Sequence, residues 1–157
     1  MARLVVQSVD RDGDFKQISI PGDDAATNGS DYAAKRAAAA ALLAAIQAIQ
    51  VPGSGAEAPT AYWAYTSEDT VLEPDAAVFP NSAQVNTKWQ IEYIVNGVAA
   101  EKKHVPIPIA YLDHADAVVQ NGRIEIPIGT GDGATLVAAF EAFYTTATVE
   151  AIFHDER

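Results

Sequence analysis

Two segments near the N-terminus have the hydrophobic pattern of β-strands. Residues 4–9 are rich in valine, and residues 15–20 alternate between apolar and polar side chains with a period of two. Gly13, in the segment between them, tolerates the positive φ of a tight turn. The sequence therefore predicts a β-hairpin that ends at Pro21.

The spacing changes to intervals of three and four between residues 31 and 50, which indicates a helix. Its other positions are mostly alanine, which has the highest intrinsic helix propensity. A second helical pattern covers residues 133–145, and Asp132 is the residue that we expect to cap it. The apolar positions of the two helices are Leu42, Leu43, Ile46, Ile49, Leu136, Val137, Phe140 and Phe143.

Further strands are predicted at residues 61–66, 88–95, 123–128 and 148–153. Asn96-Gly97 is a favoured two-residue hairpin turn, which would place Trp89 opposite His104. Each proline removes a backbone donor, so residues 105–109 are expected to form an edge strand or an extended arm.

The order of these elements predicts an α+β fold with mostly antiparallel β-sheet and two helices. We expect a single compact domain over residues 1–157, with a division into two similar halves, residues 1–66 and 88–157, as an open alternative. The halves would be joined by an irregular segment, residues 67–87. Ile18-Ser19-Ile20-Pro21 resembles Ile124-Glu125-Ile126-Pro127, which leaves two interpretations: an internal ββαβ-type duplication, or one undivided domain that ends two strands in the same way.

The charge of the chain excludes several classes of partner. It has 21 acidic and 10 basic residues, and its formal net charge is −11. Because nucleic-acid binding depends on clustered cations, we expect no nucleic-acid partner. Anionic lipid is disfavoured for the same reason, and the apolar run at residues 37–49 is too short to span a bilayer, so no membrane partner is expected.

No motif indicates a reaction. His104, His114 and His154 lack the spacing of a metal-binding motif, and the loop at residues 129–133 departs from both nucleotide-binding templates. There is no cysteine and no Gly-X-Ser-X-Gly sequence to supply a nucleophile. We therefore expect a protein that is not an enzyme, with no catalytic residues, no metal and no cofactor.

Extended, proline-containing segments favour contacts with other proteins, because they can add strands or arms to a neighbour. We expect subunit contacts in two segments, residues 105–111 and part of 67–87. The open alternative is that both are ordinary surface loops. The candidate contact residues are Val105, Pro106, Ile107, Pro108, Ile109, Tyr111, Val78 and Phe79.

Several stretches together resemble a known group of proteins. They are an early strand, the alanine-rich helix at residues 31–50, the hairpin at residues 89–97 leading into residues 105–109, and the ending at residues 140–152. In this layout the chain resembles small structural proteins of tailed-bacteriophage virions, especially capsid decoration (cement) proteins and related head or tail accessory proteins.

The resemblance implies a non-enzymatic protein, located in the virion, that stabilises a phage head through protein–protein contacts. Its partners would be the major capsid protein or other virion proteins, and many copies would bind a symmetric shell, with a homo-oligomer expected. One alternative is a head–tail connector or tail-tube component. An alternative of another class is a small-ligand binding module with its pocket between the second helix and the sheet.

Overall fold

The computed structural model describes residues 3–10, 15–23, 29–50, 62–65, 71–74, 84–85, 89–107 and 115–155. The first half contains β1 (Arg3–Asp10), β2 (Phe15–Pro21), α1 (Gly29–Gln50), β3 (Tyr62–Tyr65), β4 (Val71–Pro74) and β5 (Gln84–Val85). The second half contains β6 (Trp89–Val95), β7 (Lys103–Pro106), β8 (Val118–Gln120), β9 (Arg123–Ile126), α2 (Gly131–Phe143) and β10 (Ala147–His154).

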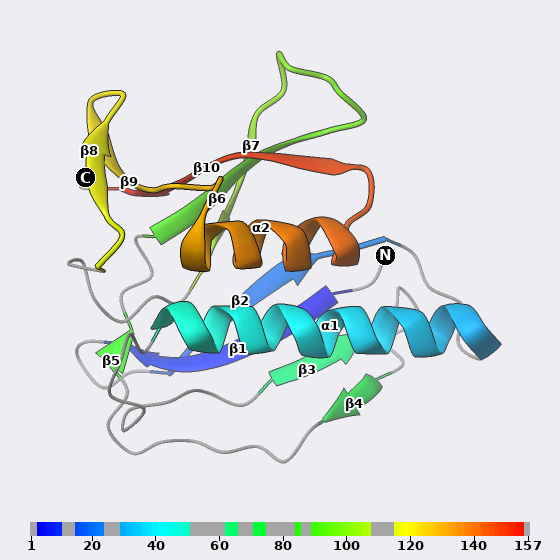
Figure 1. The fold of residues 1–157 in the computed structure, drawn as a ribbon. Helices are drawn as coiled ribbons and strands as arrows, with labels where there is room; N and C mark the ends of the chain where they lie inside the picture. The colour runs from blue at the N-terminus through cyan, green and yellow to red at the C-terminus, as the bar shows by residue number, and fades with distance from the viewer. Residues whose placement is uncertain are drawn as a thin grey trace.

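The strands form two sheets, one in each half (Figure 1). The first has the order β2-β1-β3-β4, with β5 added in parallel to the end of β1. The second has the order β7-β6-β10-β9-β8, and all its pairs are antiparallel. The predicted α+β class with two helices and mostly antiparallel sheet is thus confirmed.

The two sheets share part of their topology. In each, the strand that follows the helix returns beside the first strand of the half, β3 beside β1 and β10 beside β6, but the second half has the additional strands β8 and β9 before its helix. The two Ile-X-Ile-Pro sequences, however, occupy different places in this plan. Ile18–Pro21 lies in β2, which pairs with the first strand of its half, whereas Ile124–Ile126 lies in β9, which pairs with the last. The repeated sequence therefore does not mark equivalent strands.

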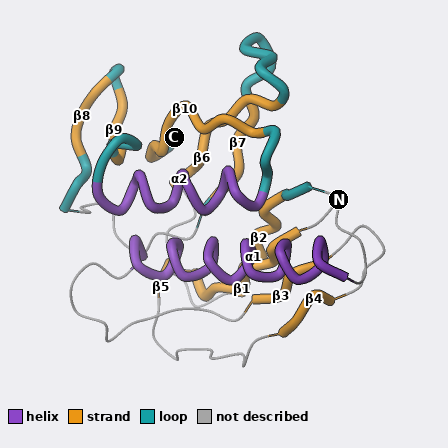
Figure 2. The backbone as a smooth tube through the Cα atoms, turned by 45° about the vertical axis from the view of Figure 1, so that its right-hand side comes forward, coloured by secondary structure: helices purple, strands orange, loops and turns teal. Residues whose placement is uncertain are grey.

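Both helices lie on one side of the sheets, next to each other and running in opposite directions (Figures 1 and 2). Their apolar faces meet one continuous core that draws on both halves. Within the described residues, the largest fully buried side chains are Trp89, Phe140, Phe143, Leu4, Ile20, Leu42, Ile46, Ile49, Ile91 and Ile107. No helix in the part of the chain that the structure describes is long and apolar enough to cross a membrane.

The hairpin of β6 and β7 has a different register from the predicted one. Asn96 and Gly97 both have positive φ, as the predicted turn requires, and the Val98 amide donates to the Val95 carbonyl at 3.1 Å. A second turn follows at once, because the Glu101 amide donates to the Val98 carbonyl. The return strand therefore begins only at Lys103, and His104 lies opposite Glu92 instead of Trp89.

The start of α2 also differs from the prediction. The N-cap is Thr130, in extended conformation, and Asp132 lies in the first turn of the helix. Gly133 is buried where α2 crosses the end of β9, and a Cβ atom at this position would lie 1.9 Å from the carbonyl oxygen of Pro127. The close approach of helix and strand thus depends on the missing side chain.

The segment at residues 67–87, predicted to be irregular, contains two short strands, β4 and β5. Neither strand has a recognisable sequence pattern, because each has at most four residues, too few for a periodic pattern. The remainder of this segment, with Val78 and Phe79, lies outside the described residues.

Candidate functional site

Two of the predicted contact residues are buried in the structure. Strand β7 is an edge strand of its sheet, as expected from its proline, but it turns one face towards the core. Val105 is 4% exposed and Ile107 is fully buried, and the Ile107 amide donates to the Trp89 carbonyl at 2.9 Å. Both side chains are therefore core residues and offer no contact surface, whereas Pro106 is exposed.

The other predicted contact residues, Pro108, Ile109 and Tyr111, lie outside the described residues, as do Val78 and Phe79. His114 is also outside them. Within the described ranges, no group of three or more histidine and acidic side chains is placed to hold a metal ion.

A different apolar surface lies at the opposite edge of the second sheet. Strand β8 is the last strand of this sheet, and its three residues are all exposed. Val119 is 81% exposed and Val118 is 42% exposed. The hairpin of β8 and β9 lies at the end of the sheet, beyond the start of α2 (Figure 1). We call the outer side of β8, formed by residues 118–120, the β8 edge.

The β8 edge is not among the predicted contact residues, although the sequence contains a signal for this strand. Val118-Val119-Gln120 directly precedes Asn121-Gly122, and both turn residues have positive φ in the structure. An Asn-Gly turn between two β-branched segments predicts a hairpin with a strand on each side. Only the second of these strands had been recognised.

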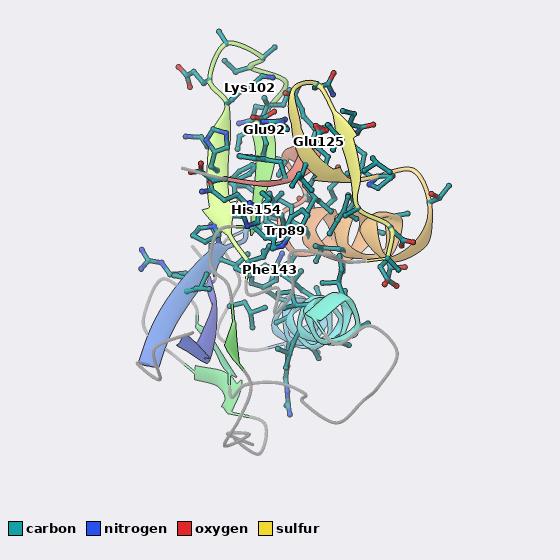
Figure 3. The ribbon with its side chains drawn as sticks, turned by 90° about the vertical axis from the view of Figure 1, so that its left-hand side faces the viewer. Trp89, Glu92, Lys102, Glu125, Phe143 and His154 are labelled. Atoms are coloured by element: carbon teal, nitrogen blue, oxygen red, sulfur yellow. The ribbon has the colours of Figure 1, made fainter. Side chains whose placement is uncertain are left out.

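A network of charged side chains covers the face of the second sheet that is turned away from the helices. At its centre is the carboxylate of Glu92, which accepts hydrogen bonds from two nitrogens of Arg123 at 3.2 and 3.3 Å. The Nε2 atom of His104 lies 3.0 Å from the same carboxylate, and Nζ of Lys102 lies 3.5 Å from it. Figure 3 shows Glu92, Lys102 and Glu125 close together at this end of the sheet.

The network extends to both sides of Glu92. Arg123 also donates to Glu125 at 3.2 Å, and Lys102 forms a second ion pair with Glu150 at 3.0 Å. The guanidinium of Arg123 stacks over the ring of Phe153, with its central carbon atom 4.1 Å from the centre of the ring. Glu92, Glu125 and Glu150 are thus each paired with a cation, and the Glu92–Arg123 pair joins β6 and β9 across the intervening strand β10.

The electrostatics of Glu92 decide what this network can do chemically. Burial acts to raise the pKa of the carboxyl, but hydrogen bonds from Arg123 and His104 and the charges of Arg123 and Lys102 outweigh it and lower the pKa to about 2. A general acid or base works best with a pKa near the operating pH. Glu92 stays ionised at neutral pH and is suited to anchoring its neighbours, not to transferring protons.

Comparison of the chain with protein-family models, with curated proteins and with solved structures finds no match.

Proposed function

We propose that this chain is a non-enzymatic structural protein of a virion, a capsid decoration or cement protein that stabilises a phage head through protein–protein contacts. Its partners are the major capsid protein or other virion proteins, and further copies of itself. The single observation that supports a contact function best is the β8 edge, where two exposed valines lie on an edge strand.

An exposed apolar edge strand is uncommon in a protein that functions alone, because its free amide and carbonyl groups recruit other strands. Natural proteins block such edges with charged residues or proline. The opposite edge of the same sheet, β7, carries Lys103, His104 and Pro106. The β8 edge has none of these, since its residues are Val118, Val119 and Gln120. This difference between the two edges supports a contact with another protein at the β8 edge.

The expectation of a ligand pocket between the second helix and the sheet has no comparable support. In the described residues this region is filled by large side chains, with the rings of Tyr93 and Phe140 in edge-to-face contact at 5.1 Å. Leu136 and Phe140 on α2 and Ile152 on β10 are fully buried. The small-ligand binding module therefore has less support in the described residues than a contact function.

Mass spectrometry of purified virus particles from the host that carries this gene tests the proposal. We expect the chain in the particles in many copies, and its absence from them would contradict the proposal. A copy number matching a single ring would favour the head–tail connector or tail-tube alternative.

The contribution of the β8 edge is tested by substitution. Val119→Lys adds a charge to the edge and is expected to lower incorporation into particles. Val98→Lys is the matched control, because Val98 is 45% exposed and lies in the turn between β6 and β7, away from β8. Equal incorporation of the two variants would show that the β8 edge does not contribute to binding in the particle.

A further inference from the structure

Two Asn-Gly sequences form tight turns in the second half of the chain. Asn96-Gly97 directly follows β6, and Asn121-Gly122 joins β8 to β9. Both asparagines have a φ of 53°, and the two glycines have φ angles of 71° and 75°. All four residues are exposed, and a Cβ atom at either glycine would meet nothing within 4 Å. The two turns therefore have nearly the same backbone and the same open space around the glycine.

An Asn-Gly sequence can lose ammonia from the asparagine side chain in an intramolecular reaction. The glycine nitrogen attacks the asparagine Cγ, and the missing side chain of glycine leaves this approach unhindered. A bond forms between these two atoms, the Cγ–Nδ2 bond breaks, and Nδ2 leaves as ammonia together with the proton of the glycine nitrogen. Water then opens the resulting succinimide ring, which leaves either aspartate or isoaspartate.

The side chain of Asn121 is held by a buried carboxylate. Its Nδ2 donates to Oε2 of Glu125 at 3.4 Å, and Glu125 is 3% exposed. Arg123 donates to the same oxygen at 3.2 Å, and Gln120 donates to the other carboxylate oxygen at 3.1 Å, so Glu125 is itself fixed in place. Attack by the Gly122 nitrogen requires the Asn121 amide group to rotate, and the hydrogen bond to Glu125 must break first.

The negative charge of Glu125 opposes the same reaction. The glycine nitrogen attacks after it has given up its proton, and this adds a negative charge to a turn that is already bound to a carboxylate. The product would carry a second carboxylate where the Asn121 amide now donates to Glu125, and the two like charges would repel each other.

The side chain of Asn96 has no such hydrogen bond to another described residue. The hydrogen bonds at this turn are formed by the backbone. The Asn96 amide donates to the Thr146 carbonyl at 2.9 Å, and the Val98 amide donates to the Val95 carbonyl at 3.1 Å. These bonds engage neither the side-chain amide of Asn96 nor the nitrogen of Gly97.

We propose that Asn96 is a site of spontaneous modification, at which the Gly97 nitrogen displaces ammonia from the side chain, and that Glu125 protects Asn121 from the same reaction. The product adds one negative charge to a chain whose net charge is −11. Isoaspartate also lengthens the main chain of the turn after β6. The protein thus changes irreversibly with age at one end of its second sheet, whether or not it functions in a virion.

Mass spectrometry of the natural chain tests the proposal, because trypsin separates the two turns. The peptides 89–102 and 104–123 contain Asn96 and Asn121, respectively, and no other asparagine. After incubation of the folded protein at weakly alkaline pH, we expect Asn96 to have reacted about fivefold faster than Asn121, the factor that corresponds to one hydrogen bond of about 1 kcal/mol. Equal rates, or a faster reaction at Asn121, would overturn the proposal.

The same measurement in denaturant separates the effect of the structure from that of the local sequence. Unfolding removes the contact between Asn121 and Glu125, so the two rates should become similar. A preference for Asn96 that persists in the unfolded chain would contradict protection by Glu125.

The variant Glu125→Ala tests the protecting residue. We expect the reaction at Asn121 to accelerate about fivefold, to the rate at Asn96. Asn96 in the same sample is the internal control, because a general loss of stability would accelerate both reactions. An unchanged rate at Asn121, or an equal acceleration at both sites, would show that Glu125 does not protect Asn121.

Discussion

Asp23 connects two parts of the chain that are 122 residues apart in sequence. Its carboxylate accepts hydrogen bonds from the Thr145 amide at 3.0 Å and the Thr145 hydroxyl at 2.6 Å. Lys35 on α1 pairs with the same carboxylate at 3.2 Å and donates to the Phe143 carbonyl at 2.9 Å. Because α2 has no basic residue in its last turn, Lys35 supplies the positive charge that favours the C-terminal end of a helix.

Replacing Asp23 with alanine should therefore destabilise the protein. Asp23→Ala leaves the partly buried Lys35 ammonium without its carboxylate and the Thr145 amide without its acceptor, at a cost of about 1–3 kcal/mol in the free energy of unfolding. Chemical denaturation measures this loss. Glu101→Ala, at an exposed position in the turn before β7, is the control and should change the stability little. Similar stabilities for both variants would show that the Asp23 contacts contribute nothing.

Acid should destabilise the protein through Glu92, whose pKa is lowered from 4.5 to about 2 in the folded state. The unfolded chain binds the proton more tightly, so the contribution of Glu92 is complete above pH about 4.5 and is lost as the pH falls towards 2. This contribution is on the order of 3 kcal/mol. Unfolding measured from pH 6 to 2 should show a shallower decline for Glu92→Gln than for the natural chain, and identical slopes would contradict the described network.

The packing of α2 against the end of β9 requires a glycine at position 133. Gly133→Ala places a methyl group against the Pro127 carbonyl, so helix and strand must move apart, and we expect a loss of about 1–3 kcal/mol. Gly129→Ala, four residues earlier, is the matched control, because a Cβ atom there meets nothing within 4 Å. Thermal melting of both variants makes the comparison, and an unchanged melting temperature for Gly133→Ala would refute the close approach.

The sequence predicted the helices and most of the strands better than the contacts and registers between them. Helix periodicity and alanine content located α1 and α2, and Asn96-Gly97 correctly marked a turn, since these signals are local. The register of β6 and β7 was predicted wrongly because a second turn at Val98–Glu101 delays the return strand. Contacts such as Asp23 with Thr145 depend on how two distant segments pack, and no local pattern encodes them.

The exposure of individual side chains on the edge strands β7 and β8 could not be predicted from the sequence either. Val105 and Ile107 were expected at the surface because their segment contains prolines, but alternation along an edge strand still turns every second side chain inwards. Val119 has the same residue type as Val105 and opposite exposure. Side-chain type alone therefore could not distinguish a core position from a contact position.

The continuous core, and not the division into two sheets, should determine how the protein unfolds. The buried cluster includes Leu4 and Ile20 of the first sheet, Trp89 and Ile152 of the second, and residues of both helices. We therefore expect one cooperative unfolding transition. In the Trp63→Phe variant, fluorescence reports only on Trp89 and circular dichroism on both halves, and their denaturation curves should coincide. Two separated transitions would show that the halves fold independently.

Hydrogen exchange at the Val119 amide, compared between the free chain and purified particles, tests whether protein covers the β8 edge in the virion. In the free chain this amide points away from β9, and we expect rapid exchange. In the particle it should be strongly protected, while the buried strand β6 is protected in both states. Equally rapid exchange at Val119 in both states would contradict a function based on strand contacts at the β8 edge.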